Sequence, residues 1–115
     1  MKRLVALILF WAFNAYSEPW TDTQKVLSAY YLTAHVIDWG QTRDSAKNYY
    51  GEKNTILGAH PSVGKVNAYF VLTPILLYYA LDAIPEYRTP ALVVLTAVEI
   101  AVVARNYRIG VKVAF

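Results

Sequence analysis

Apolar residues fall into four runs along the chain, separated by polar stretches. A short run covers residues 4–16, and longer runs centre on 26–40, 66–84 and 91–104. The longer runs leave little polar face, which is typical of helices that cross a bilayer rather than of amphipathic helices on a soluble core. We therefore expect an all-α fold, a small integral-membrane helical bundle with three or four transmembrane helices.

Flanking residues extend these runs to the length that a bilayer requires. A helix of about 20 residues crosses the roughly 30 Å of hydrocarbon, so we predict spans at about 22–42, 61–84 and 90–106. The polar stretch at about 43–60 then forms the loop between the first two of them. The bundle as a whole is predicted over residues 18–115.

The first 17 residues have the layout of a bacterial signal sequence. Lys2 and Arg3 precede the apolar run, and Ala15-Tyr16-Ser17 offers small residues at the positions that a signal peptidase requires. Residues 1–17 are therefore a cleaved signal peptide or a retained signal anchor. Cleavage leaves three spans in the mature protein, and retention leaves four.

Basic residues predict the orientation of these spans. If the N-terminus is cytoplasmic and the spans alternate in direction, nine of the eleven Lys and Arg residues fall on the cytoplasmic side, and only Lys25 and Arg88 do not. Positive charge is retained on that side during insertion. We expect a multi-pass protein of the bacterial inner membrane with its C-terminus in the cytoplasm.

Composition supports this interpretation and excludes other classes. The chain is 57% hydrophobic and 17% charged, against about 25% charged in soluble domains. Cysteine is absent, which excludes disulfides and thiolate metal sites. The net charge of +3 is scattered, so we expect no nucleic-acid partner. A soluble all-α domain, released into the periplasm if the signal is cleaved, is the alternative.

Several ionisable residues interrupt the apolar runs. His35 and Asp38 lie in the first long run, Asp82 in the second and Glu99 in the third. Because a charge at the bilayer centre costs about 2.5–3.5 kcal/mol on insertion scales, such groups are expected to face the interior. Asp82 lies near the end of its run, where it can reach Arg88 or water.

Glu99 is the deepest of the carboxyl groups. It could act as an intramembrane proton or ion relay, or it could form an interhelical hydrogen bond to His35 or to a tyrosine hydroxyl. Pro74 lies in the middle of another run, and its missing N–H should kink the helix and free a carbonyl near residue 70.

Helical spacing gathers a candidate polar cluster at the cytoplasmic end. His35, Asp38 and Thr42 share one helix face, and the following loop can close over them. The cluster comprises His35, Asp38, Gln41, Thr42, Glu52, Asn54, His60 and Asn67.

This cluster has two interpretations. His35, Asp38 and Glu52 could ligate zinc, manganese or iron, or a His–Asp pair could transfer a proton. No catalytic metal motif is present and the residues identify no cofactor. Asp38 can also simply pair with Arg43 or Lys65, so we favour a structural role.

Two segments resemble a pattern found in small inner-membrane proteins of proteobacteria and their phages. The segments are Asp38-Trp39-Gly40-Gln41-Thr42 and the stretch from Glu52-Lys53-Asn54 to Leu57-Gly58-Ala59-His60-Pro61-Ser62. The pattern reads D-x-x-Q-T followed by E-x-N-x-x-L-G-x-x-P-S, and Thr55 stands where those proteins have proline. The resemblance covers residues 35–70. It implies a membrane location and a bacterial or phage origin, and it assigns no catalytic role to any residue.

The expected function is therefore non-enzymatic. We predict a small inner-membrane protein with a structural or interaction role, and phage origin would suggest superinfection exclusion, lysis control or binding of a host membrane protein. Its partners would be the lipid bilayer and either a second copy or that host protein. The alternative is a membrane-embedded enzyme, or a metal- or proton-handling protein, that uses the His/Asp/Glu cluster.

Overall fold

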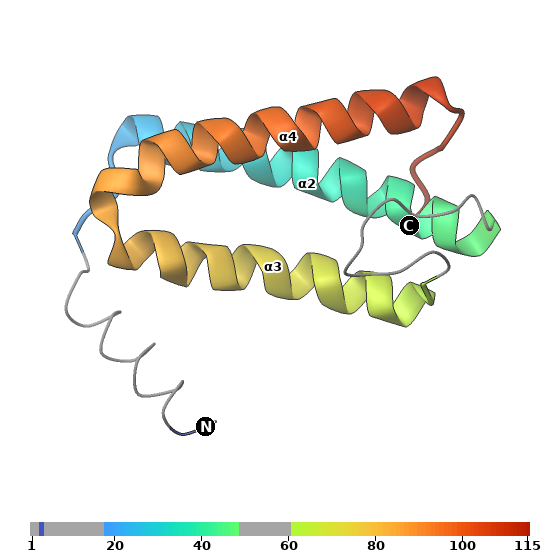
Figure 1. Ribbon diagram of the computed structural model, residues 1–115, viewed down its shortest axis with the longest axis horizontal. Helices are drawn as coiled ribbons and strands as arrows, with labels where there is room; N and C mark the ends of the chain where they lie inside the picture. Colours follow the sequence, from blue (N-terminus) through green and yellow to red (C-terminus); the bar gives the residue numbers. More distant parts are fainter. Residues whose placement is uncertain (1–2, 4–17, 49–60) are drawn as a thin grey trace.

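The computed structural model describes Arg3 and residues 18–48 and 61–115, and every regular element in this part of the chain is helical (Figure 1). Helix α2 covers Asp22–Asn48, α3 covers Val63–Ala83 and α4 covers Arg88–Arg108, with the 3-10 turn η1 at Pro85–Tyr87 between the last two. The prediction of an all-α fold is confirmed for the described residues.

Helix α2 lies between the other two helices (Figure 1). It packs against both α3 and α4, whereas α3 and α4 are joined mainly through η1. The chain runs in the same direction along α2 and α4 and in the opposite direction along α3 (Figure 1). We call the end of the bundle at η1 the turn end. The opposite end, where residues 109–115 follow α4, is the tail end.

Side chains cap the helix starts as the local sequence dictates. Thr21 and Gln24 exchange hydrogen bonds, each side chain accepting from the other residue's backbone N–H at 3.1 Å. This reciprocal capping box satisfies two of the N–H groups that lack partners at the start of a helix. Ser62 caps α3 by accepting from the Lys65 N–H at 3.1 Å.

Helix α2 continues to Asn48, past the end expected at 42, because the chain after α4 packs against it. Gly110 has a φ of 87°, which turns the chain back towards α2. The Lys112 N–H then donates to Asp44 Oδ2 at 2.9 Å, and the Ala114 N–H donates to the Gly40 carbonyl at 3.0 Å. These contacts hold the last turns of α2 in helical form.

Gly40 permits this close approach. A Cβ at this position would lie 2.7 Å from Phe115 Cε2 and would also overlap Val113 Cγ1. We predict that Gly40→Ala displaces residues 111–115 and lowers the free energy of unfolding in detergent micelles by about 1–3 kcal/mol. Gly64→Ala is the matched control, since nothing lies within 4 Å of its Cβ. Equal effects of the two substitutions would contradict the packing described here.

Polarity in the bundle is inverted relative to a water-soluble core. Among the described residues, the buried side chains include eight polar or charged ones and only seven apolar ones. Large apolar side chains instead point outwards from all three helices, from Val26 to Ile37 on α2, from Val71 to Tyr79 on α3 and from Val93 to Val102 on α4.

Two helical segments are long and apolar enough to cross a membrane, Val63–Ala83 and Pro85–Arg108. They correspond to the spans predicted at 61–84 and 90–106. Helix α2 is long enough but less apolar, because polar residues occupy the face that it buries against α3 and α4.

Candidate functional site

The central feature of the interior is a histidine–carboxylate pair between α2 and α4. His35 is 2% exposed, and its Nδ1 lies 3.2 Å from Glu99 Oε1. Its Nε2 lies 2.9 Å from the carbonyl oxygen of Phe70 on α3. One imidazole ring therefore connects all three helices. Of the two partners predicted for Glu99, a histidine or a tyrosine, the structure provides the histidine.

Pro74 explains why the Phe70 carbonyl is available to His35. In an α-helix this carbonyl would accept from the N–H of residue 74, which proline lacks. The carbonyl that the sequence predicts to be free near residue 70 is therefore that of Phe70, and His35 satisfies it. The Thr73 hydroxyl donates to the preceding carbonyl, that of Tyr69, at 2.6 Å.

These contacts determine where the imidazole carries its protons. A carbonyl oxygen can only accept, so Nε2 must donate to Phe70. The short distance between Nδ1 and Glu99 Oε1 then requires one proton between them, carried either by the ring or by the carboxyl group. The rings of Tyr31 and Phe70 hold the imidazole in place, with centroids 5.4 and 4.8 Å away.

A second polar group, the tail-end network, continues from the pair along the same face of α2. The Thr42 hydroxyl donates to Asp38 Oδ1 at 3.2 Å. The Gln41 side chain donates to the Val103 carbonyl at 3.1 Å and accepts from Asn106 Nδ2 at 3.2 Å. As helical spacing predicted, His35, Asp38, Gln41 and Thr42 are all buried.

Asn67 meets α2 at the same level but with other partners. Its Oδ1 accepts from Trp39 Nε1 at 3.0 Å and from Arg43 Nη1 at 2.6 Å. Arg43 Nε also donates to the Ala114 carbonyl at 3.1 Å. Arg43, one of two cations expected near Asp38, thus joins α3 to the C-terminal residues.

The loop members of the predicted cluster, Glu52, Asn54 and His60, lie outside the described residues, and the metal site predicted from His35, Asp38 and Glu52 therefore stays a prediction. Within residues 18–48 and 61–115, no three His, Asp or Glu side chains are arranged to hold a metal ion.

A third polar group, the turn-end cluster of Trp20, Asp82 and Arg88, lies at the opposite end of the bundle. Arg88 is 1% exposed and donates to the backbone carbonyls of Leu81, Asp82 and Pro19 at 2.8, 2.9 and 3.3 Å. Its Nη2 lies 3.5 Å from Asp82 Oδ1, which also accepts from Trp20 Nε1 at 3.0 Å. Arg88 is thus the partner expected for Asp82, but Asp82 is buried rather than facing water.

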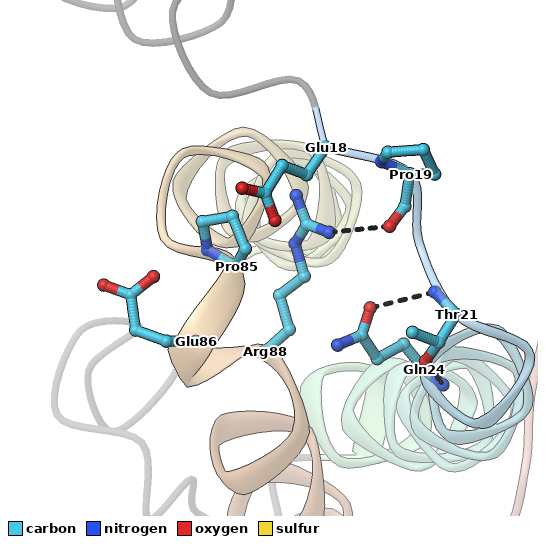
Figure 2. A pocket seen from close by; sticks show the side chains of 7 residues that line it. All are labelled: Glu18, Pro19, Thr21, Gln24, Pro85, Glu86 and Arg88. Carbon is cyan, nitrogen blue, oxygen red and sulfur yellow. Dashed lines mark hydrogen bonds between the residues drawn. The ribbon is translucent and has the colours of Figure 1, made fainter.

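Figure 2 shows that Arg88 of this cluster lines an open pocket of about 460 Å³. Arg88 points between η1 and the extended entry to α2, and Glu18 and Glu86 lie at the exposed rim. Since backbone carbonyls already occupy the guanidinium, it acts as a structural tie rather than as a free anion site. Sequence reasoning did not identify this tie to the backbone, although an arginine six residues after an aspartate in an apolar run, across a proline turn, was a usable signal.

No family model matches the chain, and no curated protein or solved structure is significantly similar to it. The class of protein is therefore described from the structure alone. The fold and the interior contacts define an all-α bundle whose helices are connected by buried polar groups, with two helices long and apolar enough to cross a membrane.

Proposed function

We propose that this chain is a small multi-span membrane protein of the bacterial inner membrane with a non-enzymatic, structural or interaction role. The observation that supports this proposal is the inverted polarity of the bundle, with buried His35, Asp38, Asp82 and Arg88 and an apolar exterior. In water, apolar surface of this extent favours aggregation. In a bilayer, lipid tails solvate this surface, and most of the interior polar groups form hydrogen bonds with one another or with backbone carbonyls.

The same argument extends the proposal to α2. Its outward face between Val26 and Ile37 is apolar except for Thr33, whose hydroxyl donates to the Ala29 carbonyl, and its other polar side chains from Ser28 to Thr42 are at least partly buried. A helix of this kind crosses a bilayer only as part of a bundle that covers its polar face. Three spans from α2, α3 and α4 are therefore proposed for the described residues.

Charge at the two ends supports a cytoplasmic tail end. Within residues 18–48 and 61–115, the tail end carries six basic side chains, whereas the turn end carries Lys25 and the buried Arg88. The positive-inside rule places the more basic end in the cytoplasm. The six are Arg43, Lys47, Lys65, Arg105, Arg108 and Lys112.

A charge on the exterior tests the membrane proposal directly. Val94 is 61% exposed in the first half of α4, two turns from its start, so Val94→Asp places a carboxylate in lipid, at a cost of up to about 2.5–3.5 kcal/mol. We expect the variant to be depleted at least tenfold from alkali-washed membranes. In a soluble protein the same surface change would alter stability by less than about 0.5 kcal/mol.

Tyr107→Asp is the matched control. Tyr107 is 79% exposed on the same helix but lies at the tail end, at the level expected for the membrane surface. Its variant should be recovered with the membranes at the parental level. Recovery of both the parent and Val94→Asp in the soluble fraction would overturn the membrane proposal.

The interaction role is tested by photo-cross-linking in cells from outward positions on each helix, Ile37, Ile75 and Val98. An interaction role predicts a discrete adduct from at least one helix face, at twice the chain's mass for a second copy or at another defined mass for a host membrane protein. Superinfection exclusion, lysis control and host-protein binding would all use such a surface. Cross-links to lipid alone from all three positions would contradict the interaction role.

A further inference from the structure

We propose that a groove between α2 and α3 at the turn end binds one phospholipid molecule. One acyl chain of the lipid lies in the groove, and the lipid phosphate contacts Lys25. The lipid is zwitterionic, with a primary ammonium group beside its phosphate. The proposal deepens the general expectation of a bilayer partner into a defined lipid site, and it rests on the membrane insertion proposed above.

The groove consists of two adjoining cavities. The outer cavity is open, measures about 600 Å³ and lies between the start of α2 and Tyr78 on α3. The inner cavity measures about 60 Å³ and reaches Leu92 on α4. Trp20, Ser28, Leu32 and Tyr78 line both cavities, so the two form one groove. Its outer part has the volume of a typical small-molecule site, about 300–1,000 Å³.

The lining of the groove is mainly apolar, because the protein itself uses several of its polar groups. Trp20 Nε1 donates to Asp82 Oδ1 at 3.0 Å, and the Ser28 hydroxyl donates to a backbone carbonyl one turn earlier in α2 at 2.8 Å. The phenol groups in the lining belong to Tyr31 at the inner cavity and to the half-exposed Tyr78. A hydrocarbon chain suits such a lining better than a polar ligand does.

One wall of the groove is held in position before any ligand binds. The Trp20 indole stacks on the Tyr78 ring, with centroids 5.5 Å apart and planes 9° from parallel. The Arg88 guanidinium carbon lies 4.7 Å from the centroid of the same indole. A wall fixed in this way loses little conformational freedom on binding, which favours affinity.

The depth of the groove matches one leaflet of a bilayer. Lys25 lies in the first turn of α2 and Leu32 seven residues later, which is about 10 Å along the helix. Half of the hydrocarbon layer is about 15 Å thick. Ala29, Leu32 and Tyr78 are exposed, so the groove opens sideways onto the apolar exterior. An acyl chain can therefore enter from the adjacent leaflet without leaving the bilayer.

The charges around the groove select the headgroup. Lys25 lines the outer cavity and forms no ion pair with any described residue, so its ammonium group can contact a phosphate. Glu18, Asp22 and Glu86 are exposed at the same end, and these carboxylates disfavour a headgroup with net negative charge. Asp22 neighbours Lys25 on the helix surface, three residues before it. It can contact the ammonium group of a zwitterionic headgroup.

Native mass spectrometry of the full chain tests the proposal. The delipidated chain in detergent is titrated with an equimolar mixture of phosphatidylethanolamine and phosphatidylglycerol that carry the same acyl chains. We expect one retained phosphatidylethanolamine as the main adduct. It should exceed phosphatidylglycerol at least about threefold, because the acidic residues near the site repel the net charge of the latter.

Two variants test the two halves of the site. Ala29→Trp fills the outer cavity and should lower lipid retention at least about tenfold by steric exclusion. Ala97→Trp, the same change at an exposed position of α4, is its control. Lys25→Gln should lower retention at least about fivefold, because the charge-assisted contact to phosphate is lost. Lys47→Gln, at an exposed position of the tail end, is its control. Neither control should change retention.

A phosphatidylethanolamine with a photoactivatable diazirine in its acyl chain locates the lipid in proteoliposomes. Adducts should concentrate on residues 28–32 and 74–78, relative to Val94. Val94 and Ser28 each lie six residues after the start of their helix, and Val94 is exposed outside the groove. Lipid that only surrounds the bundle would label both helices equally.

Several results would overturn the proposal. They are equal labelling inside and outside the groove, preference for phosphatidylglycerol, retention that is unchanged in either Ala29→Trp or Lys25→Gln, and a second copy of the chain in place of lipid as the main adduct. Failure of membrane insertion gives a different result, because the parent chain would then not float with the liposomes.

Discussion

Replacing Arg88 with methionine should destabilise the bundle more than any other single change at its turn end. The substitution retains an unbranched side chain but removes the donors to the Leu81, Asp82 and Pro19 carbonyls. It also leaves the buried Asp82 carboxylate without its cation. Loss of one partner from a buried pair costs about 3–5 kcal/mol, which should appear in the free energy of unfolding in mixed detergent micelles.

Two variants test whether the loss of stability comes from the buried contacts of Arg88. Arg108→Met removes an exposed arginine from the other end of the same helix and should change the free energy of unfolding by less than about 0.5 kcal/mol. Arg88→Met combined with Asp82→Asn should cost less than the sum of the single changes, because no buried charge is then left unpaired. A loss below about 1 kcal/mol for Arg88→Met alone would show that the tie contributes little.

His35→Ala should cause a second large loss, because the side chain connects three helices. It removes the partner of Glu99 and the donor to the Phe70 carbonyl, and it leaves a cavity between the Tyr31 and Phe70 rings. We expect a loss of up to about 3–5 kcal/mol, because the Glu99 carboxyl group, whose side chain is 17% exposed, loses its histidine partner. The measurements are the free energy of unfolding and the amount of protein in washed membranes.

Pro74→Ala separates the contribution of the Phe70 carbonyl from that of Glu99. The substituted residue regains a backbone N–H that can donate to the Phe70 carbonyl along the helix, so His35→Ala should cost about 1–3 kcal/mol less in a Pro74→Ala background. Val36→Ala, an exposed neighbour on α2, is the control and should cost under about 0.5 kcal/mol. Equal costs of His35→Ala in the two backgrounds would show that the carbonyl does not depend on His35.

His35 and Asp38 also distinguish a structural cluster from a catalytic one. If His35→Ala and Asp38→Ala both reduce accumulation in the membrane, the cluster holds the bundle together. If both variants insert and accumulate normally but lose bound metal or an activity, the membrane-enzyme alternative gains support, with Glu52 as the next residue to test.

Some features of the structure could be predicted from properties of neighbouring residues. The apolar runs indicated the helices, helical periodicity placed His35, Asp38 and Thr42 on one buried face, and the missing N–H of Pro74 located a free carbonyl at Phe70. Each of these follows from covalent structure or from the 3.6-residue repeat, so no knowledge of distant contacts was needed.

Which side chains contact one another in the bundle depends on segments that lie far apart in the chain. The sequence alone determined an all-α chain with ionisable groups inside apolar helices, because hydropathy and periodicity are properties of neighbouring residues. Only the tertiary structure decided that one imidazole satisfies both Glu99 and Phe70, that Arg88 is buried with Asp82, and that residues 111–115 pack over Gly40. The crossing of three helices sets those distances, and many crossings are compatible with the same hydrophobic pattern.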